Sequence, residues 1–581
     1  MTLLAAADAI WKTAASFGAP VGTVSYTVVF FIFGTLLSST LFSLSELMYI
    51  TPYATYTTLG SAYVDPAVGY IMGLNYLLQV GWETAGELLG VVIYIGYWDK
   101  DMTRGRMGMY IGIITAVCIV VNVGRFKGSP YLQRTLDASK LLLVICMFIF
   151  CVVVTTKNRP SHGWVAPHGK YYRTEPFNNH FSGVVTPRAL SRFLGFWAVW
   201  AKCMYAYSGL EGFPGLPRAD GFKSDPRMLR TNLIGPAKTM WFRICLTYVV
   251  VIVTYCLNIS MHSTWLLGPN KPPRDTPTAP VYVAIAHMAG VKGLAHLVNA
   301  VVLTNGLVAT ILNMGSTARA FNYVLDSTFN RLSEKASVDG AEPDPAGAAP
   351  VPLPKIVQLA FPRLGGWLGT NDLPIGGLLV GIGFAALSFI ALDHGLNQCF
   401  LWFTGLSGTS SIVLWAAINL CYVRARKALI LRGVRGKVKL PLQHHMQPFL
   451  AYFCIPFFTI IFLFNGFWVW IPKFEGVQFV MSYLTFPYTI IPYILYKLWW
   501  RTRVVDLRQI NFGACARGLL HSEKKPSVVV DNTGVDPAMV VDAGVINEKK
   551  KKKVTTRRVP VPSDTSDSSP LASSPSASDL A

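Results

Sequence analysis

Residues 205–217 read Tyr205-Ala206-Tyr207-Ser208-Gly209-Leu210-Glu211-Gly212-Phe213-Pro214-Gly215-Leu216-Pro217. An apolar helix that starts near residue 189 therefore runs into three glycines and two prolines at membrane depth. Broken helices are tolerated inside membranes where they line a cavity, and transporters use them to expose backbone groups to substrate. A freed N–H attracts a carboxylate and a freed C=O attracts an ammonium, and an amino acid carries both. The alternative is that the glycines simply end the helix at the membrane surface.

The rest of the chain is equally apolar. Of its 581 residues, 52% are hydrophobic and only 14% are charged, whereas a soluble chain of this length normally carries far more surface charge. A bilayer core needs roughly 20 mostly apolar residues per helix, and only helices or closed barrels satisfy the backbone in lipid. The apolar runs lack the alternation of barrel strands. We therefore predict an all-α membrane protein with about twelve transmembrane helices, near residues 3–18 (incomplete), 22–50, 67–97, 108–123, 133–155, 189–213, 240–262, 294–314, 374–392, 398–421, 449–471 and 478–500.

The C-terminal residues have a different composition. They contain five consecutive lysines at 549–553 and end in a Ser/Pro/Asp-rich segment that cannot build a core. We predict a transmembrane domain at 1–505 and a disordered cytoplasmic tail at 506–581. The lysine run is interpreted as a solvated or lipid-facing patch, and no nucleic-acid partner is expected.

The net charge of +21 is explained by membrane topology. If the N-terminus is cytoplasmic and twelve helices follow, the inside loops hold more Lys and Arg than the outside loops. Cytoplasmic loops of membrane proteins collect these residues. Both termini of this multi-pass protein are therefore predicted to be cytoplasmic. We expect it in the plasma membrane, with an organelle membrane as the alternative.

Several ionisable residues fall inside the predicted helices, where they usually face the bundle interior or water. Glu83 and Glu87 are four residues apart on one helical face. If both face a cavity, their repulsion makes one of them a plausible proton acceptor; the alternative is that Glu83 lies near the membrane surface. Lys140 could have a functional role, or its side chain could simply extend to the cytoplasmic surface. Glu46 suits a structural or interfacial role.

Short motifs along residues 20–510 resemble the fungal amino acid permeases of the amino acid–polyamine–organocation superfamily. They include Asp65-Pro66-Ala67-Val68-Gly69-Tyr70, Gly73-Leu74-Asn75-Tyr76, Glu87-Leu88, Ser208-Gly209-Leu210-Glu211, Asp225-Pro226-Arg227, Ile234-Gly235-Pro236-Ala237, Phe400-Leu401-Trp402, Tyr422-Val423-Arg424 and Leu463-Phe464-Asn465-Gly466-Phe467.

This resemblance implies a LeuT-like fold with a five-plus-five inverted-repeat core and a substrate site at broken helices one and six. It implies uptake of amino acids with the proton as the coupling ion. It implies no cofactor. The helix-six backbone that meets substrate corresponds to Tyr205, Ala206, Tyr207, Ser208, Gly209 and Leu210. Lys140 corresponds to the helix-five lysine that takes the place of a sodium ion in sodium-coupled relatives, and Glu87 to the helix-three glutamate. With Glu211, these two are our candidates for proton coupling or gating.

Two departures from the family pattern bear on function. The glycine-rich stretch of the family's first helix should fall near residues 1–8, which read Met1-Thr2-Leu3-Leu4-Ala5-Ala6-Ala7-Asp8 and contain no glycine, so the first helix is expected to be truncated. The usual polar position of helix eight is Ile311. These departures leave a non-transporting amino-acid sensor, or a truncated inactive permease, as alternatives to a secondary active importer of amino acids.

An enzyme is not expected, because no H-E-x-x-H, G-x-S-x-G or clustered set of metal ligands is present. We therefore predict no catalytic residue and no metal site. The expected partners are an amino acid, a proton and membrane lipid.

Overall fold

The structure is a computed structural model, and it describes residues 23–51, 54–123, 142, 145–154, 184–215, 239–252, 281–291, 293–338, 375–431, 447–471 and 473–510. All of them belong to one compact unit of the chain, Met1–Glu523. Every regular element among these residues is helical. The predicted first helix and Lys140 lie outside the described residues.

The described helices follow the predicted order. The long ones are α2 (Thr23–Ile50), α4 (Pro66–Ile95), α5 (Arg104–Val123), α7 (Arg188–Tyr207), α12 (Leu294–Val338), α15 (Ile375–Leu387), α17 (Leu396–Leu431), α18 (Gln447–Leu463) and α20 (Thr485–Trp500). Shorter apolar helices at Ile145–Val154 and Thr239–Ile252 occupy part of two further predicted spans. Six described helices are long and apolar enough to cross a membrane, or seven if α19 (Gly476–Tyr483) and α20 form one bent span. The chain is an all-helical membrane protein.

Some boundaries differ from the prediction. Helix α12 continues to Val338, through residues that we expected to form a loop after 314. The sequence 315–338 is polar but contains no proline. The helix can therefore continue beyond the end of its hydrophobic segment. Two short helices, α3 (Tyr56–Tyr63) and α11 (Val281–Met288), were not predicted. The first turn of α3 is closed by a capping box between Thr55 and Thr58.

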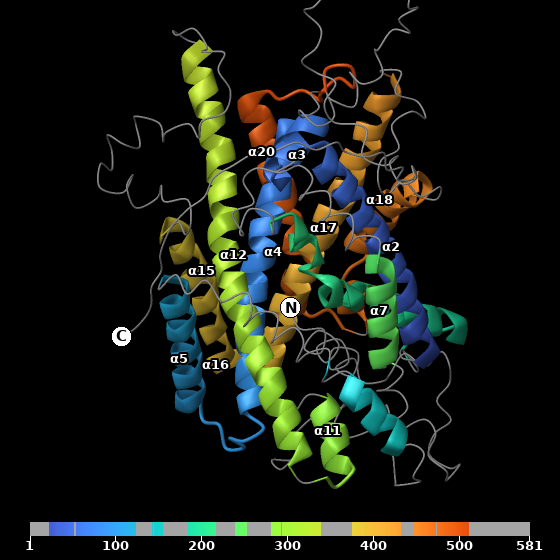
Figure 1. The fold of residues 1–581 in the computed structure, drawn as a ribbon, viewed down its shortest axis with the longest axis vertical. Helices are drawn as coiled ribbons and strands as arrows, with labels where there is room; N and C mark the ends of the chain where they lie inside the picture. The colour runs from blue at the N-terminus through green and yellow to red at the C-terminus, as the bar shows by residue number, and fades with distance from the viewer. Residues whose placement is uncertain are drawn as a thin grey trace, which may run out of the picture. The chain divides into compact units, whose positions relative to one another are not determined.

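Helix α4 lies at the centre of the described unit, where it packs against α12 and α17 (Figure 1). Helix α17 also contacts α2, α7 and α18. Short helix α3 crosses α4 so closely that a Cβ atom on Gly69 would lie 2.3 Å from the carbonyl oxygen of Thr57. Only glycine permits this approach. The central position of α4 explains why its side chains are buried along nearly the whole helix.

The outward faces of several helices are apolar and exposed. Val120 on α5, Leu297 on α12, Leu379 on α15 and Phe449 on α18 are each more than 60% exposed. A soluble protein rarely shows such extended apolar surface. These faces fit the hydrocarbon of a bilayer, in agreement with the prediction from composition.

Polar contacts join the helix ends at one side of the bundle. The Lys497 Nζ atom of α20 lies 2.6 Å from Oδ2 of Asp65, the N-cap of α4. Arg424 of α17 donates to the carbonyl oxygens of Tyr63 and Val505, and the Val505 N–H donates to the Val64 carbonyl. The start of α4, the last turns of α17 and the segment after α20 therefore lie together. A multi-pass topology requires these ends to share one side of the membrane.

Candidate functional site

The broken helix predicted from the sequence is present. Helix α7 ends at Tyr207, Ser208 and Gly209 leave the helical conformation, and a 3-10 helix, η1 (Leu210–Gly215), follows. Gly209 has φ +88°, in the left-handed region that side chains other than glycine rarely adopt. Ser208 is buried, so the break lies inside the bundle and not at its surface. This burial favours the interpretation that the break is part of a site inside the protein.

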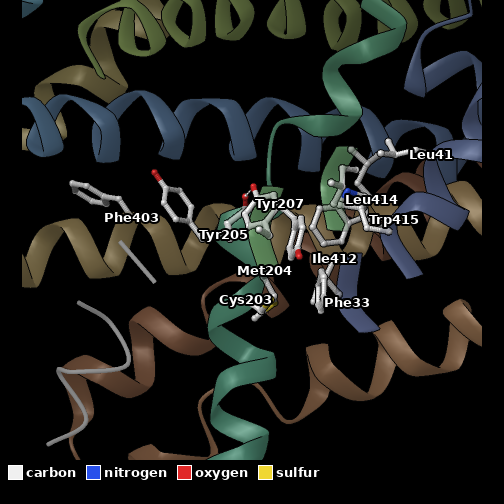
Figure 2. Close-up of a cluster of buried hydrophobic side chains, with 14 of the residues drawn as sticks. Phe33, Leu41, Cys203, Met204, Tyr205, Tyr207, Phe403, Ile412, Leu414 and Trp415 are labelled. Atoms are coloured by element: carbon white, nitrogen blue, oxygen red, sulfur yellow. Dashed lines mark hydrogen bonds between the residues drawn. The ribbon is translucent and has the colours of Figure 1, made fainter. Parts of the chain in front are cut away.

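The side chains around the break point in two directions. The Tyr205 hydroxyl donates to Oε1 of Glu87 on α4 across 3.2 Å. The Tyr207 hydroxyl instead donates to the carbonyl oxygen of Phe30 on α2 across 2.8 Å, and its ring stacks on Phe33 at 5.3 Å. In Figure 2, Tyr205 lies on the side of Phe403, while Tyr207 lies nearer Phe33. The two tyrosines thus anchor α7 to different neighbouring helices.

Backbone groups at the break already have partners within the protein. The Gly209 N–H donates to Oε1 of Glu211 across 3.1 Å. The Ala206 carbonyl accepts from the Tyr248 hydroxyl, and the Glu211 carbonyl accepts from the Tyr56 hydroxyl. The Glu211 carboxylate therefore sits at the N–H where the sequence argument places a substrate carboxylate.

Three buried carboxylates surround this break. Glu83 and Glu87 of α4 and Glu211 of η1 are each no more than 2% exposed. Glu83 and Glu211 meet at one side chain, because the Gln79 amide nitrogen donates to Oε1 of both, across 3.4 Å to Glu83. Two like unit charges ~5 Å apart repel by about 3 kcal/mol at an effective dielectric constant of about 20. An empty site that holds both as anions is therefore costly, and a cation or a proton is the natural compensation.

Hydroxyl groups of α7 and α17 complete the cluster. Ser208 donates to Oε1 of Glu83, and its oxygen lies 3.1 Å from Ser407 Oγ and 2.7 Å from Ser411 Oγ. Ser407 also donates to Glu83 Oε1 across 3.2 Å. The Trp415 indole nitrogen donates to Oε2 of Glu211 across 3.1 Å. Helices α4, α7 and α17 thus converge on one polar site.

The sequence analysis missed Gln79, Ser407, Ser411 and Trp415. A signal for them exists. Gln79, Glu83 and Glu87 follow one another at intervals of four, which puts them on one face of α4. Ser407, Ser411 and Trp415 show the same interval on α17.

Other predicted residues lie elsewhere. Glu46 is buried on α2, where it faces Tyr422 and Arg426 of α17. It has no contact with the carboxylates at the break in the described structure. Leu210 is half-buried at the start of η1. Ile311, the apolar residue at the expected polar position, is partly buried on α12, and its carbonyl accepts from Asn122 of α5 across 3.1 Å.

Within the described ranges, no group of three or more His, Cys, Asp or Glu side chains is arranged to hold a metal ion. The carboxylates at the break are bound instead by amide, hydroxyl and indole donors. Such partners suit an organic ligand or a proton.

A family model described as "amino acid permease" matches residues 10–324 and 357–509. This chain belongs to the amino acid permease family. Its members are transporters and not enzymes, and the family resemblance inferred from short motifs is confirmed over most of the chain.

Curated relatives are permeases of fungi. The chain is 25% identical over 489 residues to a general amino-acid permease of Candida albicans, which covers 83% of this chain and 73% of the relative. It is 25% identical to a general amino-acid permease of Saccharomyces cerevisiae, over 81% of this chain and 70% of the relative. A proline-specific permease of Emericella nidulans is 24% identical, over 76% of this chain and 72% of the relative. These permeases differ in the substrates that their names give, so family membership alone does not assign one here.

Proposed function

We propose that this permease imports amino acids across the plasma membrane by proton-coupled secondary transport, with substrate bound at the α7–η1 break. The observation that carries the proposal is the non-helical turn at Ser208 and Gly209 inside the bundle, bordered by Glu83, Glu87 and Glu211. An amino acid needs an N–H donor for its carboxylate and acceptors for its ammonium, and both kinds of group are present here.

Substrate binding then becomes an exchange of partners. The Gly209 N–H is held by the Glu211 carboxylate, so an incoming substrate carboxylate has to displace it. Proton uptake by Glu211 weakens its bond to this N–H, because a neutral acid is a poorer acceptor than a carboxylate. Protonation of Glu211 and binding of a substrate carboxylate would therefore favour each other. This linkage is the basis of the proposed symport.

Glu87 is proposed as a second residue of the coupling machinery. The Tyr205 hydroxyl donates to Glu87, and Tyr205 belongs to the last turn of α7 before the break. A change in the charge of Glu87 therefore acts directly on the segment that carries the substrate site. Lys140 remains a proposed partner in gating on the strength of the family resemblance.

The proposed topology has both termini in the cytoplasm. The start of α4, the last turns of α17 and the segment after α20 lie at one side, which an even number of crossings between them explains. We propose that residues 1–505 form a permease domain with five-plus-five inverted repeats, and that 506–581 form a cytoplasmic tail. The first tail residues pack on the helices, since Ile510 is fully buried.

The test is uptake of a panel of radiolabelled amino acids at two external pH values by permease-deficient fungal cells. The cells would express this chain, Glu87→Gln or Lys140→Ala, with surface delivery measured for each. We expect uptake that rises at acidic pH and falls in both variants. Absence of uptake from a well-delivered protein, together with retained binding of an amino acid, would instead establish the non-transporting sensor.

A further inference from the structure

The hydrogen-bond partners of Glu83 and Glu211 are all uncharged within the described residues. Glu83 Oε1 accepts from Gln79, Ser208 and Ser407, and no donor to its Oε2 atom lies among the described residues. Glu211 accepts from Gln79, the Gly209 N–H and Trp415. Buried carboxylates are normally paired with a cation or bound to a metal. The charge that compensates this pair is therefore expected to come from outside these contacts.

A separate feature of the same site is an unused acceptor on Gln79. The side chain is fully buried, and its Nε2 atom donates to three groups of the cluster, whereas its Oε1 atom has no hydrogen-bond partner among the described residues. A buried acceptor without a donor is unfavourable and is rare in folded proteins. A lysine-type ammonium has three donors and an arginine-type guanidinium has five, and neither has an acceptor. Either group matches a site that offers unused acceptors.

The space beside Glu83 is left free by the residue at the break. A Cβ atom on Gly209 would lie 3.7 Å from Glu83 Oε2 and 3.9 Å from Oε1, with no other described residue within 4 Å beyond its chain neighbours. A small group at the Gly209 position would therefore be in van der Waals contact with the Glu83 carboxylate, at the turn that is proposed to hold the substrate. The Glu83 carboxylate is therefore the nearest group to a Cβ atom at this turn among the described residues.

Charge balance distinguishes between substrate classes. The ammonium and carboxylate of an amino acid cancel each other, so a neutral amino acid with one coupled proton on Glu211 adds no charge to balance Glu83. One coupled proton on Glu211 and one side-chain cation beside Glu83 balance the two carboxylates that meet at Gln79. An acidic side chain would add a further negative charge beside these carboxylates. We infer that this permease selects amino acids with a positively charged side chain, of the lysine or arginine type, and that Glu83 is the residue that binds that charge.

This inference rests on the proposed site at the α7–η1 break, and its test uses a matched pair of ligands. Lysine and norleucine differ only in the ε-ammonium group. Competition by each against labelled lysine or arginine uptake should show lysine to be at least ~10-fold more effective, as expected for a hydrogen-bonded charged group. In Glu83→Gln the ratio of the inhibitory effectiveness of lysine to that of norleucine should fall towards 1. Glu46→Gln, which neutralises a buried carboxylate outside the site, should keep the wild-type ratio.

Equal competition by norleucine, or an unchanged ratio in Glu83→Gln, would overturn the inference while leaving amino-acid transport intact. If no amino acid is taken up, transport itself fails, and ligand selectivity is then read from binding. Thermal stabilisation of the purified wild-type protein by lysine but not by norleucine would support the inference. Stabilisation by norleucine to the same degree, or by neither ligand, would contradict it.

Discussion

The indole nitrogen of Trp415 lies 3.1 Å from Oε2 of Glu211 and donates a hydrogen bond to it. The other oxygen of Glu211 accepts from the Gly209 N–H, also across 3.1 Å. One carboxylate thus connects α17 to the turn that breaks the α7 helix. Because the Trp415 ring is fully buried against Phe33 and Phe458, its N–H has little freedom to point elsewhere. The conformation of the turn therefore depends on a side chain about two hundred residues away in the chain.

Trp415→Phe should reduce amino-acid uptake, because it removes the donor while keeping an aromatic ring. A hydrogen bond to a charged group contributes roughly 1.5–3 kcal/mol, so we expect about a 10- to 100-fold fall in Vmax/KM. The measurement is radiolabelled uptake, corrected for surface delivery. Trp402→Phe is the control, since its indole bonds Gln478 outside the site; a similar loss in both variants would contradict a specific role for Trp415.

Ser208→Ala should impair transport more than Ser410→Ala. The Ser208 hydroxyl contacts Gln79, Glu83, Ser407 and Ser411, so its removal deprives the Glu83 carboxylate of a donor. We expect at least about a 10-fold loss of uptake. Ser410 is equally buried, but its hydroxyl bonds Tyr488 on α20 at 2.5 Å, away from the break. Equal effects of the two substitutions would show that the polar site has no special importance.

Gly209→Ala should destabilise the protein and lower uptake. At φ +88° a Cβ atom is strained, at a cost of about 1–3 kcal/mol, and it would also enter the space beside Glu83. Gly405→Ala is the matched control, because Gly405 is inside α17 and a Cβ atom there would have no described residue of another element within 4 Å. That control should be neutral or stabilising by up to about 1 kcal/mol. The unfolding temperature in detergent and the rate of uptake should both be lower for Gly209→Ala than for Gly405→Ala.

The Asp65–Lys497 pair should make stability depend on pH only under acidic conditions. Burial alone would raise the pKa of Asp65, but hydrogen bonds from Lys497 and from the Ala67 N–H outweigh it and hold that pKa below its usual value. A lowered pKa stabilises the folded state above the unfolded value of about 3.9 and loses this effect as pH falls through the folded value. Asp65→Asn should therefore lower the unfolding temperature at pH 5–8.

This difference between Asp65→Asn and wild type should shrink below about pH 4, where the wild-type carboxyl also becomes protonated. Lys497→Met removes the other partner of the same ion pair. A double-mutant cycle between Asp65→Asn and Lys497→Met measures their coupling. A coupling of zero would show that Asp65 acts only as the N-cap of α4.

Much of the fold follows from the sequence, because each transmembrane helix must satisfy its own backbone hydrogen bonds and bury its polar groups away from lipid. Hydrophobic runs alone located α2, α4, α5, α17 and α18 to within a few residues at most ends. The same reasoning placed the break at Ser208 and Gly209. The predicted boundary was wrong where a helix continues beyond its apolar region, as in α12 after residue 314. Helix propensity and not hydrophobicity governs the structure of those residues.

The composition of the site was decided by tertiary structure. From spacing alone, Glu83 could lie at the membrane surface, and Glu211 was an isolated carboxylate after a glycine. Only the packing of α4 against α17, with α7 alongside, brings both carboxylates to the amide of Gln79 and to the hydroxyls of Ser208 and Ser407. The sequence by itself determined the membrane helices and the break, because those depend on local composition. Which polar groups meet at the break depends on contacts between helices hundreds of residues apart, and these are set by how the helices pack.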